Sequence, residues 1–415
     1  MSDALPHGWR PGTLADVISS ISAGVSVNGE DRPVREGEVG VLKITAVLHG
    51  LFEPQHHKAV VPAERHRVAC PVRGGTVLFS RSNNAELVGA SAYVPNDVPE
   101  LFLPDLLWAL SVRDGVDPQW LAYVLSDPAF RPRLLAVATG TSATMKKISQ
   151  ASLISLPVVI PPRQEQERIV AILSTWDRGI ASAEGLVAAA AVHVDGLTSQ
   201  HLDLFIPGTS REDKKLPLIC LGDAFDERDE TGHEDEPLLA ITGDRGVVPR
   251  EEIERRDTSA EDKGAYRLIL PGDIGYNTMR MWQGVCGLSA LRGIVSPAYT
   301  VLTPRSGVMD GIFAAVLFKA PHMIEWLRRY SQGIVDDTLS LKFEQFRQIR
   351  IRLPSLETQR RVANAIHAIR AEADVTARLA AKLREQKQAL MARLLSGSLR
   401  VGGKAERASA EIAHA

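Results

Sequence analysis

Two groups of polar and basic side chains follow apolar runs at corresponding places in the two halves of the chain. The first group comes directly after TVLF at 76–79, and the second comes after DIGY at 273–276. Arginine can read a guanine edge and asparagine an adenine edge, each through two hydrogen bonds. We therefore predict a base-reading DNA surface made of Ser80, Arg81, Ser82, Asn83 and Asn84 in the first half, and of Asn277, Thr278, Met279 and Arg280 in the second.

Further basic side chains suit contacts to phosphate groups, which position a protein on DNA without reading its sequence. Lys146 and Lys147 precede one long helical segment, and Lys342 precedes another. Lys43 and Arg245 lie in matching strand–loop segments. For any single one of these residues, an ordinary solvated loop position is the simpler interpretation. Because the pattern recurs in both halves, we interpret the set as a DNA interface.

The sequence carries no recognisable catalytic motif. GGKA at 402–405 lacks the hydroxyl residue that completes a phosphate-binding loop, and IPPR at 160–163 lacks the polar and aromatic positions of an adenine methyltransferase motif. No nucleophile elbow GxSxG or zinc helix HExxH occurs. The adjacent pair His56 and His57 indicates a loop rather than a metal site, because neighbouring side chains point in different directions. We therefore predict no catalytic site, no metal and no cofactor bound by this chain.

The composition indicates a folded chain whose positive charge is local. The 415 residues suffice for two or three domains, and 45% hydrophobic with 24% charged residues is ordinary for globular proteins. A net charge of −2 counts against DNA binding through bulk positive charge alone. The three cysteines lie far apart, and we see neither a signal peptide nor an apolar run of the ~20 residues that span a bilayer. We expect a cytoplasmic protein without disulfides.

An internal repeat organises the chain. IPPRQEQERIVAIL at 160–173 aligns with LPSLETQRRVANAI at 353–366, which starts 193 positions later. Near the start of each copy, Asp16 in TLADV matches Asp223 in CLGDA, which lies 207 positions later. The falling offset means that the first copy carries about 14 additional residues, as loop insertions would produce. The chain is therefore two tandem copies of one plan.

Two segments, 159–207 and 353–400, are rich in helix-favouring residues and follow prolines. Apolar side chains repeat in each with the seven-residue period of a helix that packs along a partner helix. We predict that the two helices pair antiparallel as a spacer of ~60 Å, at about 1.5 Å per residue. The alternative is that each helix packs only on its own domain. The predicted seam residues are Ile169, Trp176, Ile180, Val187, Val194, Leu197, Val362, Ile366, Ile369, Leu383, Leu390 and Leu394.

The remaining segments, 1–158 and 208–352, show short β-like runs separated by Gly, Pro, Asn and Asp. Helical stretches accompany them, for example at 104–115 and 118–138. We predict a mixed α/β fold: two tandem α/β domains joined by two long antiparallel helices that form a coiled coil, with pseudo-twofold symmetry. Residues 401–415 are polar, and we expect a disordered tail there.

From about residue 5 to 401 the chain resembles the specificity subunits of type I restriction–modification systems. The matching pieces of the first copy are GTVLFSRSN followed by ELVG, IPPRQEQERIVAIL and HLDLFIPG. Those of the second copy are YRLILPGDIGYNTM, GIVSPAY, LPSLETQRRVANAI and ALMARLLSGSLRV. No single piece is specific for this family. The order of the pieces, which occurs twice at one spacing, is specific.

The resemblance implies that each α/β domain is a target recognition domain that reads half of a split site in double-stranded DNA. The two long helices would dock two adenine methyltransferase subunits, and two restriction/translocase subunits would join where the system contains them. S-adenosylmethionine, ATP and Mg²⁺ would belong to those partners. Because the two domains differ strongly from each other, the target should be asymmetric, and base-reading residues cannot be carried over from relatives with other targets.

Two other interpretations remain open at this point. The chain could be a coiled-coil scaffold that binds proteins without DNA specificity. It could also be a nuclease that uses a carboxylate cluster such as Asp226, Glu227, Asp229 and Glu230, although a solvated acidic loop is the simpler explanation of that cluster.

Overall fold

The computed structural model describes residues 5–140, 145–253, 263–335 and 338–401, without the side chains of His49 and Ser199. The chain forms two compact units. Unit 1 comprises the residues up to Ser182 and those from Leu379 onward, and unit 2 comprises Ala183–Arg378. Each unit contains one of the predicted domains and about half of each long helical segment. The predicted tail, apart from Val401, lies outside the described residues.

Unit 1 is built on a four-stranded antiparallel sheet with the order β2-β11-β7-β9, which comprises β2 (Ile18–Ala23), β11 (Leu107–Val112), β7 (Val77–Ser80) and β9 (Ser91–Tyr93). A five-stranded sheet comprises β3 (Gly29–Glu30), β5 (His57–Val60), β4 (Gly40–Leu42), β10 (Val98–Phe102) and β6 (Pro71–Val72) in that order. Two pairs complete the strands: β1 (Arg10–Thr13) with β13 (Pro157–Ile160), and β12 (Lys146–Lys147) with β8 (Ser82–Asn83).

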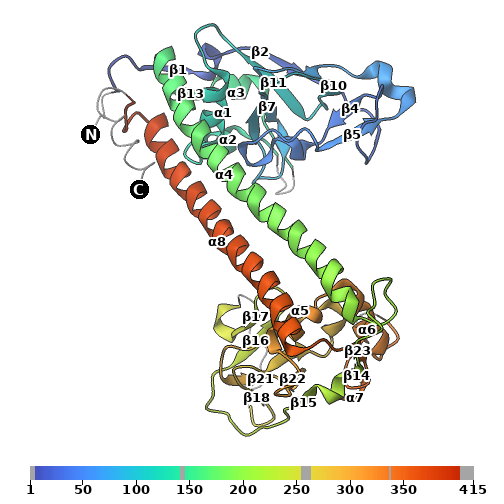
Figure 1. The fold of residues 1–415 in the computed structure, drawn as a ribbon. Coiled ribbons are helices and arrows are strands. Elements are labelled where there is room, and N and C mark those ends of the chain that lie inside the picture. Colours follow the sequence, from blue (N-terminus) through green and yellow to red (C-terminus); the bar gives the residue numbers. More distant parts are fainter. Residues whose placement is uncertain (1–4, 141–144, 254–262, 336–337, 402–415) are drawn as a thin grey trace. The chain divides into compact units, whose positions relative to one another are not determined.

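The helices of unit 1 contribute to the same main core as the four-stranded sheet (Figure 1). They are α1 (Pro118–Ser126), α2 (Arg131–Val137), α3 (Gln150–Ile154), the first half of α4 (Arg163–Leu197) and the last part of α8 (Leu356–Leu395). Asp117 caps α1 by accepting hydrogen bonds from the backbone N–H groups of Gln119 and Trp120. The ring of Trp120 is 1% exposed, and the rings of Phe79 and Trp108 stack in the same core.

One predicted helix is wrong. The stretch 104–115 contains strand β11, which pairs with β2 on one side and with β7 on the other. The run LLWAL is apolar on all sides, so its pattern is equally compatible with a buried helix and with a central strand. Pairing with residues far away in sequence decides between them, and local sequence carries no record of it.

Unit 2 repeats this plan with shorter strands. Its four-stranded antiparallel sheet has the order β15-β22-β19-β20, which comprises β15 (Phe225–Glu227), β22 (Tyr299–Pro304), β19 (Ile274–Asn277) and β20 (Cys286–Leu288). Three pairs accompany it: β14 (Leu218–Cys220) with β23 (Arg350–Arg352), β16 (Leu239–Thr242) with β17 (Gly246–Pro249), and β18 (Arg267–Ile269) with β21 (Gly293–Val295). The helices are α5 (Gly311–Leu317), α6 (Pro321–Tyr330), α7 (Phe343–Phe346) and the remaining parts of α4 and α8.

The repeat found in the sequence is visible in individual backbone pairings. In unit 1 a bridge joins Thr139 to Lys147, and in unit 2 a bridge joins Gln332 to Ser340. Both partners are shifted by the same 193 positions. The four-stranded sheets correspond strand by strand, from β2 and β15 at one edge to β9 and β20 at the other. The five-stranded sheet of unit 1 has no counterpart of that size in the described part of unit 2, and it accounts for much of the extra length of the first copy.

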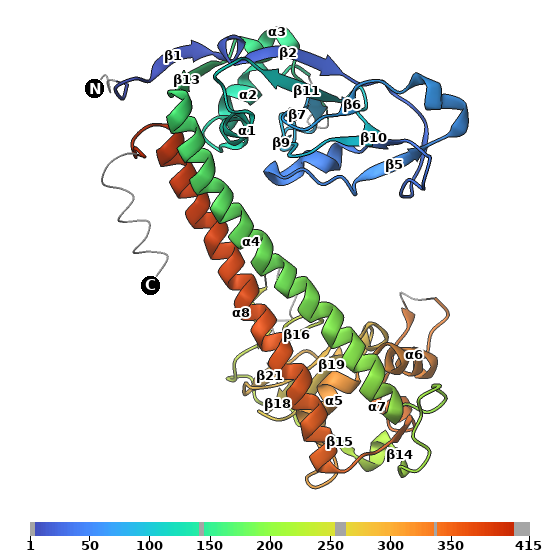
Figure 2. The same cartoon turned by 45° about the horizontal axis from the view of Figure 1, so that its top comes forward.

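The long helices α4 and α8 lie side by side within each unit and run in opposite directions (Figures 1 and 2). In unit 1, Ile169 and Leu173 of α4 share a core with Met391 and Leu394 of α8. In unit 2, Val194 of α4 shares a core with residues of α8. All the predicted seam side chains are buried or half-buried. The mixed α/β fold with paired antiparallel helices is therefore confirmed, and each helix packs on its partner as well as on a domain.

Helix α4 and the turns that follow it, Arg163–Phe205, contain an 18-residue window long and apolar enough to cross a membrane by length and composition. This differs from the expectation drawn from the sequence, because the stretch between Arg178 and Asp195 is mostly Ala, Val and Leu. Only 17% of that window is buried. Its heptad positions pack as described above, so what stands out is the apolar character of its outer face.

Candidate nucleic-acid interface

Arg81 joins strands β7 and β8 in unit 1, and backbone hydrogen bonds hold it on both sides. Its N–H donates to the carbonyl of Leu106 at 3.0 Å, and its carbonyl accepts from the N–H of Ile148 at 2.9 Å. The guanidinium lies over the ring of Trp108, 5.7 Å from the ring centroid. The Nε atom is buried, and no described residue accepts its hydrogen. The structure therefore places this predicted base-reading residue firmly.

Two neighbours of Arg81 are not available to a ligand. Ser80 is fully buried and Ser82 is 3% exposed. Successive side chains along a strand point to opposite faces. Ser80 and Ser82 therefore point inward, on the face opposite to that of Arg81. Their hydroxyl groups cannot contact DNA in this structure, which corrects the prediction that they do.

The two asparagines that follow serve the loop backbone. The Oδ1 atom of Asn83 accepts from the N–H of Asn84 at 2.8 Å. The Oδ1 atom of Asn84 accepts from the N–H groups of Glu86 and Leu87 at 3.0 and 2.9 Å. These contacts form a turn of the kind that asparagine favours. The acceptor atoms that would pair with an adenine are therefore engaged within the protein.

The predicted phosphate-binding lysines of unit 1 lie in two places. Lys146 and Lys147 form β12, which runs antiparallel to β8 and places Lys147 opposite Ser82. The Nζ atom of Lys146 donates to the carbonyl of Gly140 at 2.6 Å, whereas the side chain of Lys147 is exposed. Lys43, which directly follows β4, pairs with Asp31. Only the β12 lysines therefore join the Arg81 loop.

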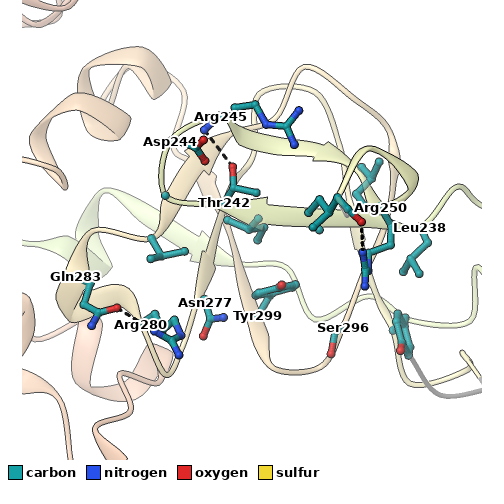
Figure 3. Close-up of a pocket in the computed structure, with 17 residues that line it drawn as sticks. Leu238, Thr242, Asp244, Arg245, Arg250, Asn277, Arg280, Gln283, Ser296 and Tyr299 are labelled. Atoms are coloured by element: carbon teal, nitrogen blue, oxygen red, sulfur yellow. Dashed lines mark hydrogen bonds between the residues drawn. The ribbon is translucent and has the colours of Figure 1, made fainter. Parts of the chain in front are cut away.

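Unit 2 holds a cavity of about 620 Å³ between the β16–β17 hairpin and the end of β19 (Figure 3). Asn277, Arg280 and Gln283 line its lower side, and Thr242 and Arg245 belong to the hairpin above (Figure 3). The structure therefore brings three of the predicted DNA-contacting residues, from two separate segments of the chain, around one hollow. Arginine and carboxamide side chains can both read base edges.

The side chains around this cavity differ in how many of their polar atoms are already bonded within the protein. Arg280 donates from Nη1 to Oε1 of Gln283 at 3.3 Å, and both side chains are exposed. Asn277 accepts from the N–H of Met279 at 2.9 Å. Arg245 forms an ion pair with Glu252 at 3.2 Å. Of the predicted residues, Arg280 is the best placed to reach a ligand.

The remaining predicted residues of unit 2 flank the same loop. The carbonyl of Thr278 accepts from the N–H of Leu341 at 2.8 Å, which matches the bond between Arg81 and Ile148 in unit 1. Lys342 precedes helix α7 and is exposed, and Met279 is 42% exposed. Lys342 therefore follows directly after Leu341, which is bonded to this loop, and lies two positions after Ser340, the equivalent of Lys147 in the repeat.

Two residues of the candidate interface were not predicted. Trp108 supports Arg81 but lies in the stretch 104–115, for which the sequence predicts a helix. Gln283 follows Arg280 by three residues on a short 3-10 turn. The spacing of three residues between Arg280 and Gln283 is only a weak signal for a shared site. It brings the two side chains together in a helical turn but not in an extended segment.

Three of the four acidic residues considered for a nuclease site, Asp226, Glu227 and Glu230, are paired with arginines. Hydrogen bonds from Arg305 lower the pKa of Asp226 below its usual value, so this carboxylate is ionised and paired. The pairs are Asp226–Arg305 at 2.7 Å, Glu227–Arg267 at 2.7 Å and Glu230–Arg228 at 3.6 Å. Among the described residues, no group of three or more His, Cys, Asp or Glu side chains could hold a metal ion.

The fold and these loops define a class of protein with two related α/β domains and a pair of long helices. Residues 6–189 match the family model of the type I restriction modification DNA specificity domain. The specificity subunit of the type I restriction enzyme EcoEI from Escherichia coli is 25% identical over 174 residues, which span 41% of this chain and 29% of that protein. The MjaX specificity subunit of Methanocaldococcus jannaschii is 20% identical over 96% of this chain and 95% of that protein.

Solved structures agree on the fold. The type I restriction–modification S subunit from M. genitalium covers 95% of this chain and 97% of its own, with a TM-score of 0.58 and 15% identity. A chain from a study of type I R-M complex assembly and conformational transition covers 95% of this chain and 100% of its own, with a TM-score of 0.55 and 18% identity. Residues 6–189 therefore match a type I restriction modification DNA specificity domain, and the chain as a whole shares the fold of type I restriction–modification S subunits.

Proposed function

We propose that this chain reads a bipartite, asymmetric DNA site and positions methyltransferase subunits on it, without catalysing a reaction itself. Unit 1 would read one half-site with the Arg81 loop, and unit 2 would read a different half-site with the loop around Arg280. The bases between the half-sites would remain unread.

One observation carries this proposal. The two loops have the same backbone frame, because Ile148 donates to Arg81 in unit 1 and Leu341 donates to Thr278 in unit 2. The side chains on that frame differ, with an arginine in the first and a threonine in the second. A shared frame that presents different hydrogen-bonding groups is what two domains need in order to read different bases.

The paired helices support a spacer role. Helix α4 has 35 residues and α8 has 40, and each contributes to both units. At about 1.5 Å per residue, such helices reach ~50–60 Å, longer than one ~34 Å turn of DNA. Related by a pseudo-twofold axis, they would keep the two recognition loops at a set distance.

The outer faces of the helices support two docking sites for adenine methyltransferase subunits. Leu186 of α4 is 62% exposed and Leu379 of α8 is 53% exposed. These leucines are 193 positions apart, so the repeat makes them equivalent. Large exposed apolar side chains at equivalent positions favour two copies of one partner that buries them. S-adenosylmethionine would bind those subunits, and ATP and Mg²⁺ would serve two restriction/translocase subunits where a system has them. We expect such a complex in the cytoplasm.

Methylation mapping tests the proposal. The chain is expressed in a methylation-free host with the adenine methyltransferase of its own system, and the genome is sequenced for methyladenine. We expect methyladenine in one split, asymmetric motif only when both proteins are present. Methylation that is absent, unrelated to sequence, or unchanged without this chain would overturn the proposal and favour a protein scaffold.

A further inference from the structure

Arg81 differs from Lys43 and Lys146 in its bonding. Lys43 is paired with Asp31, and Lys146 donates to a backbone carbonyl. Arg81 has no ion pair in the part of the chain that the structure describes, and its terminal Nη groups donate to no described residue. An unpaired arginine that is half-buried carries a desolvation cost that a ligand could offset.

The protein limits the positions that this guanidinium can take. Trp108, which lies beneath it, is 2% exposed and stacks in turn on Phe79 with ring centroids 6.0 Å apart. The backbone of Arg81 is hydrogen-bonded to Leu106 and Ile148, which lie on two other segments, so its main chain is fixed in position. Nε is buried, but the residue as a whole is half-buried, so the two Nη groups are the donors left for a ligand.

We propose that Arg81 recognises a guanine in the half-site read by unit 1. The two Nη groups of a planar guanidinium match the O6 and N7 acceptors of guanine in the major groove. The guanidinium already lies over Trp108, so less conformational freedom is lost on binding than for a fully exposed arginine. Lys147, exposed on the adjacent strand β12, supplies a phosphate contact that carries no base preference. This inference rests on the proposed function and adds to it a base, a residue and a supporting ring.

Arg81→Lys tests the proposal in the complete complex with the methyltransferase, because it keeps the charge and removes the two-pronged geometry. Methyladenine mapping should show that one guanine of one half-site becomes degenerate, while the other half-site is unchanged. In binding assays with purified complex, discrimination at that position should fall roughly 5- to 150-fold. Arg81→Met, which keeps the stem over Trp108, provides a second variant with the same expected result.

Lys147→Ala is the matched control. It should weaken binding to all sequences alike and reduce the dependence of affinity on salt, with the methylated motif unchanged. If both Arg81 variants assemble with the methyltransferase and methylate the original motif, or weaken all sequences equally, the guanine assignment is overturned. If the unaltered chain directs no motif at all, the proposed function has failed and not this inference alone.

Discussion

The side-chain amide of Gln166 accepts a hydrogen bond at Oε1 from the backbone N–H of Asp117 at 2.8 Å. Gln359 does the same for Asp310 at 2.8 Å in unit 2. Each glutamine lies in the first turns of a long helix and is almost fully buried. Asp117 and Asp310 cap the helices α1 and α5. The same bond therefore fastens each α/β domain to the start of its long helix.

The amide nitrogens of these glutamines are also engaged. Nε2 of Gln166 donates to the carbonyl of Pro161 at 2.9 Å, and Nε2 of Gln359 donates to the carbonyl of Pro354 at 3.0 Å. Buried carboxamides with both ends paired specify one arrangement, because any shift leaves polar groups unsatisfied.

Replacing Gln166 by leucine should destabilise unit 1 by about 1–3 kcal/mol, because the part-buried N–H of Asp117 would lose its acceptor. Urea unfolding of the purified chain measures the loss. Gln164→Leu is the control, since Gln164 lies on the same turn but is exposed. Equal effects of the two substitutions would contradict the fastening role of Gln166.

Shortening both helices by one heptad tests the spacer. Deleting 187–193 together with 380–386 removes equivalent residues, keeps the seam in register and shortens the pair by ~10 Å. DNA selected by the purified complex should contain the same half-sites, with a gap shorter by about three base pairs at ~3.4 Å each. Deleting only one of the segments should disrupt helix pairing. An unchanged gap between the half-sites in the double deletion would refute the spacer role of the helices.

Charged residues on the outer helix faces should abolish methyltransferase docking. Leu186→Asp and Leu379→Asp each place a carboxylate where we expect an apolar contact, so each should remove one methyltransferase subunit, and the double variant both. Native mass spectrometry counts the subunits. Leu291→Asp is the control, because Leu291 is also exposed, at 36%, but lies in a loop of unit 2. Full occupancy in the double variant would place the docking surface elsewhere.

Stability should depend on pH through Glu38 in unit 1. Hydrogen bonds from Arg32, then from the backbone of Arg35, lower the pKa of Glu38 to about 2 from an ordinary value of 4.5. A lowered pKa in the folded state means that the ionised form stabilises the fold. This contribution is fully present above about pH 4.5 and is lost as the pH falls towards 2.

Glu38→Gln should therefore lower the unfolding midpoint in urea at pH 7, and the difference from the unaltered chain should shrink between pH 4.5 and pH 2.5. Glu36→Gln, at an exposed position two residues earlier, should show neither effect. If the difference in unfolding midpoint between Glu38→Gln and the unaltered chain stays constant across this pH range, the ion pair with Arg32 is not the source of that difference.

The sequence periodicity was sufficient to predict the long helices and the residues between them. A seven-residue repeat depends only on where side chains fall along one helix, so Ile169, Val194 and Ile366 could be assigned to the inner faces from the sequence. The tandem plan was equally readable, because motif order survives in a chain even where sequence has diverged. The loops after TVLF and DIGY were located by the same repeat.

Only the tertiary structure decided which side chains in those loops can meet a ligand. Ser80 is fully buried and Arg81 half-buried on the opposite face because β7 pairs with β11 in one register, and a shift of one residue would exchange the two faces. Trp108 supports Arg81 because two segments more than twenty residues apart meet in one sheet. Such non-local hydrogen bonds depend on the whole fold, whereas helix seams depend on near neighbours. The pairing of the long helices could therefore be predicted, and the arrangement of side chains at the candidate nucleic-acid interface could not.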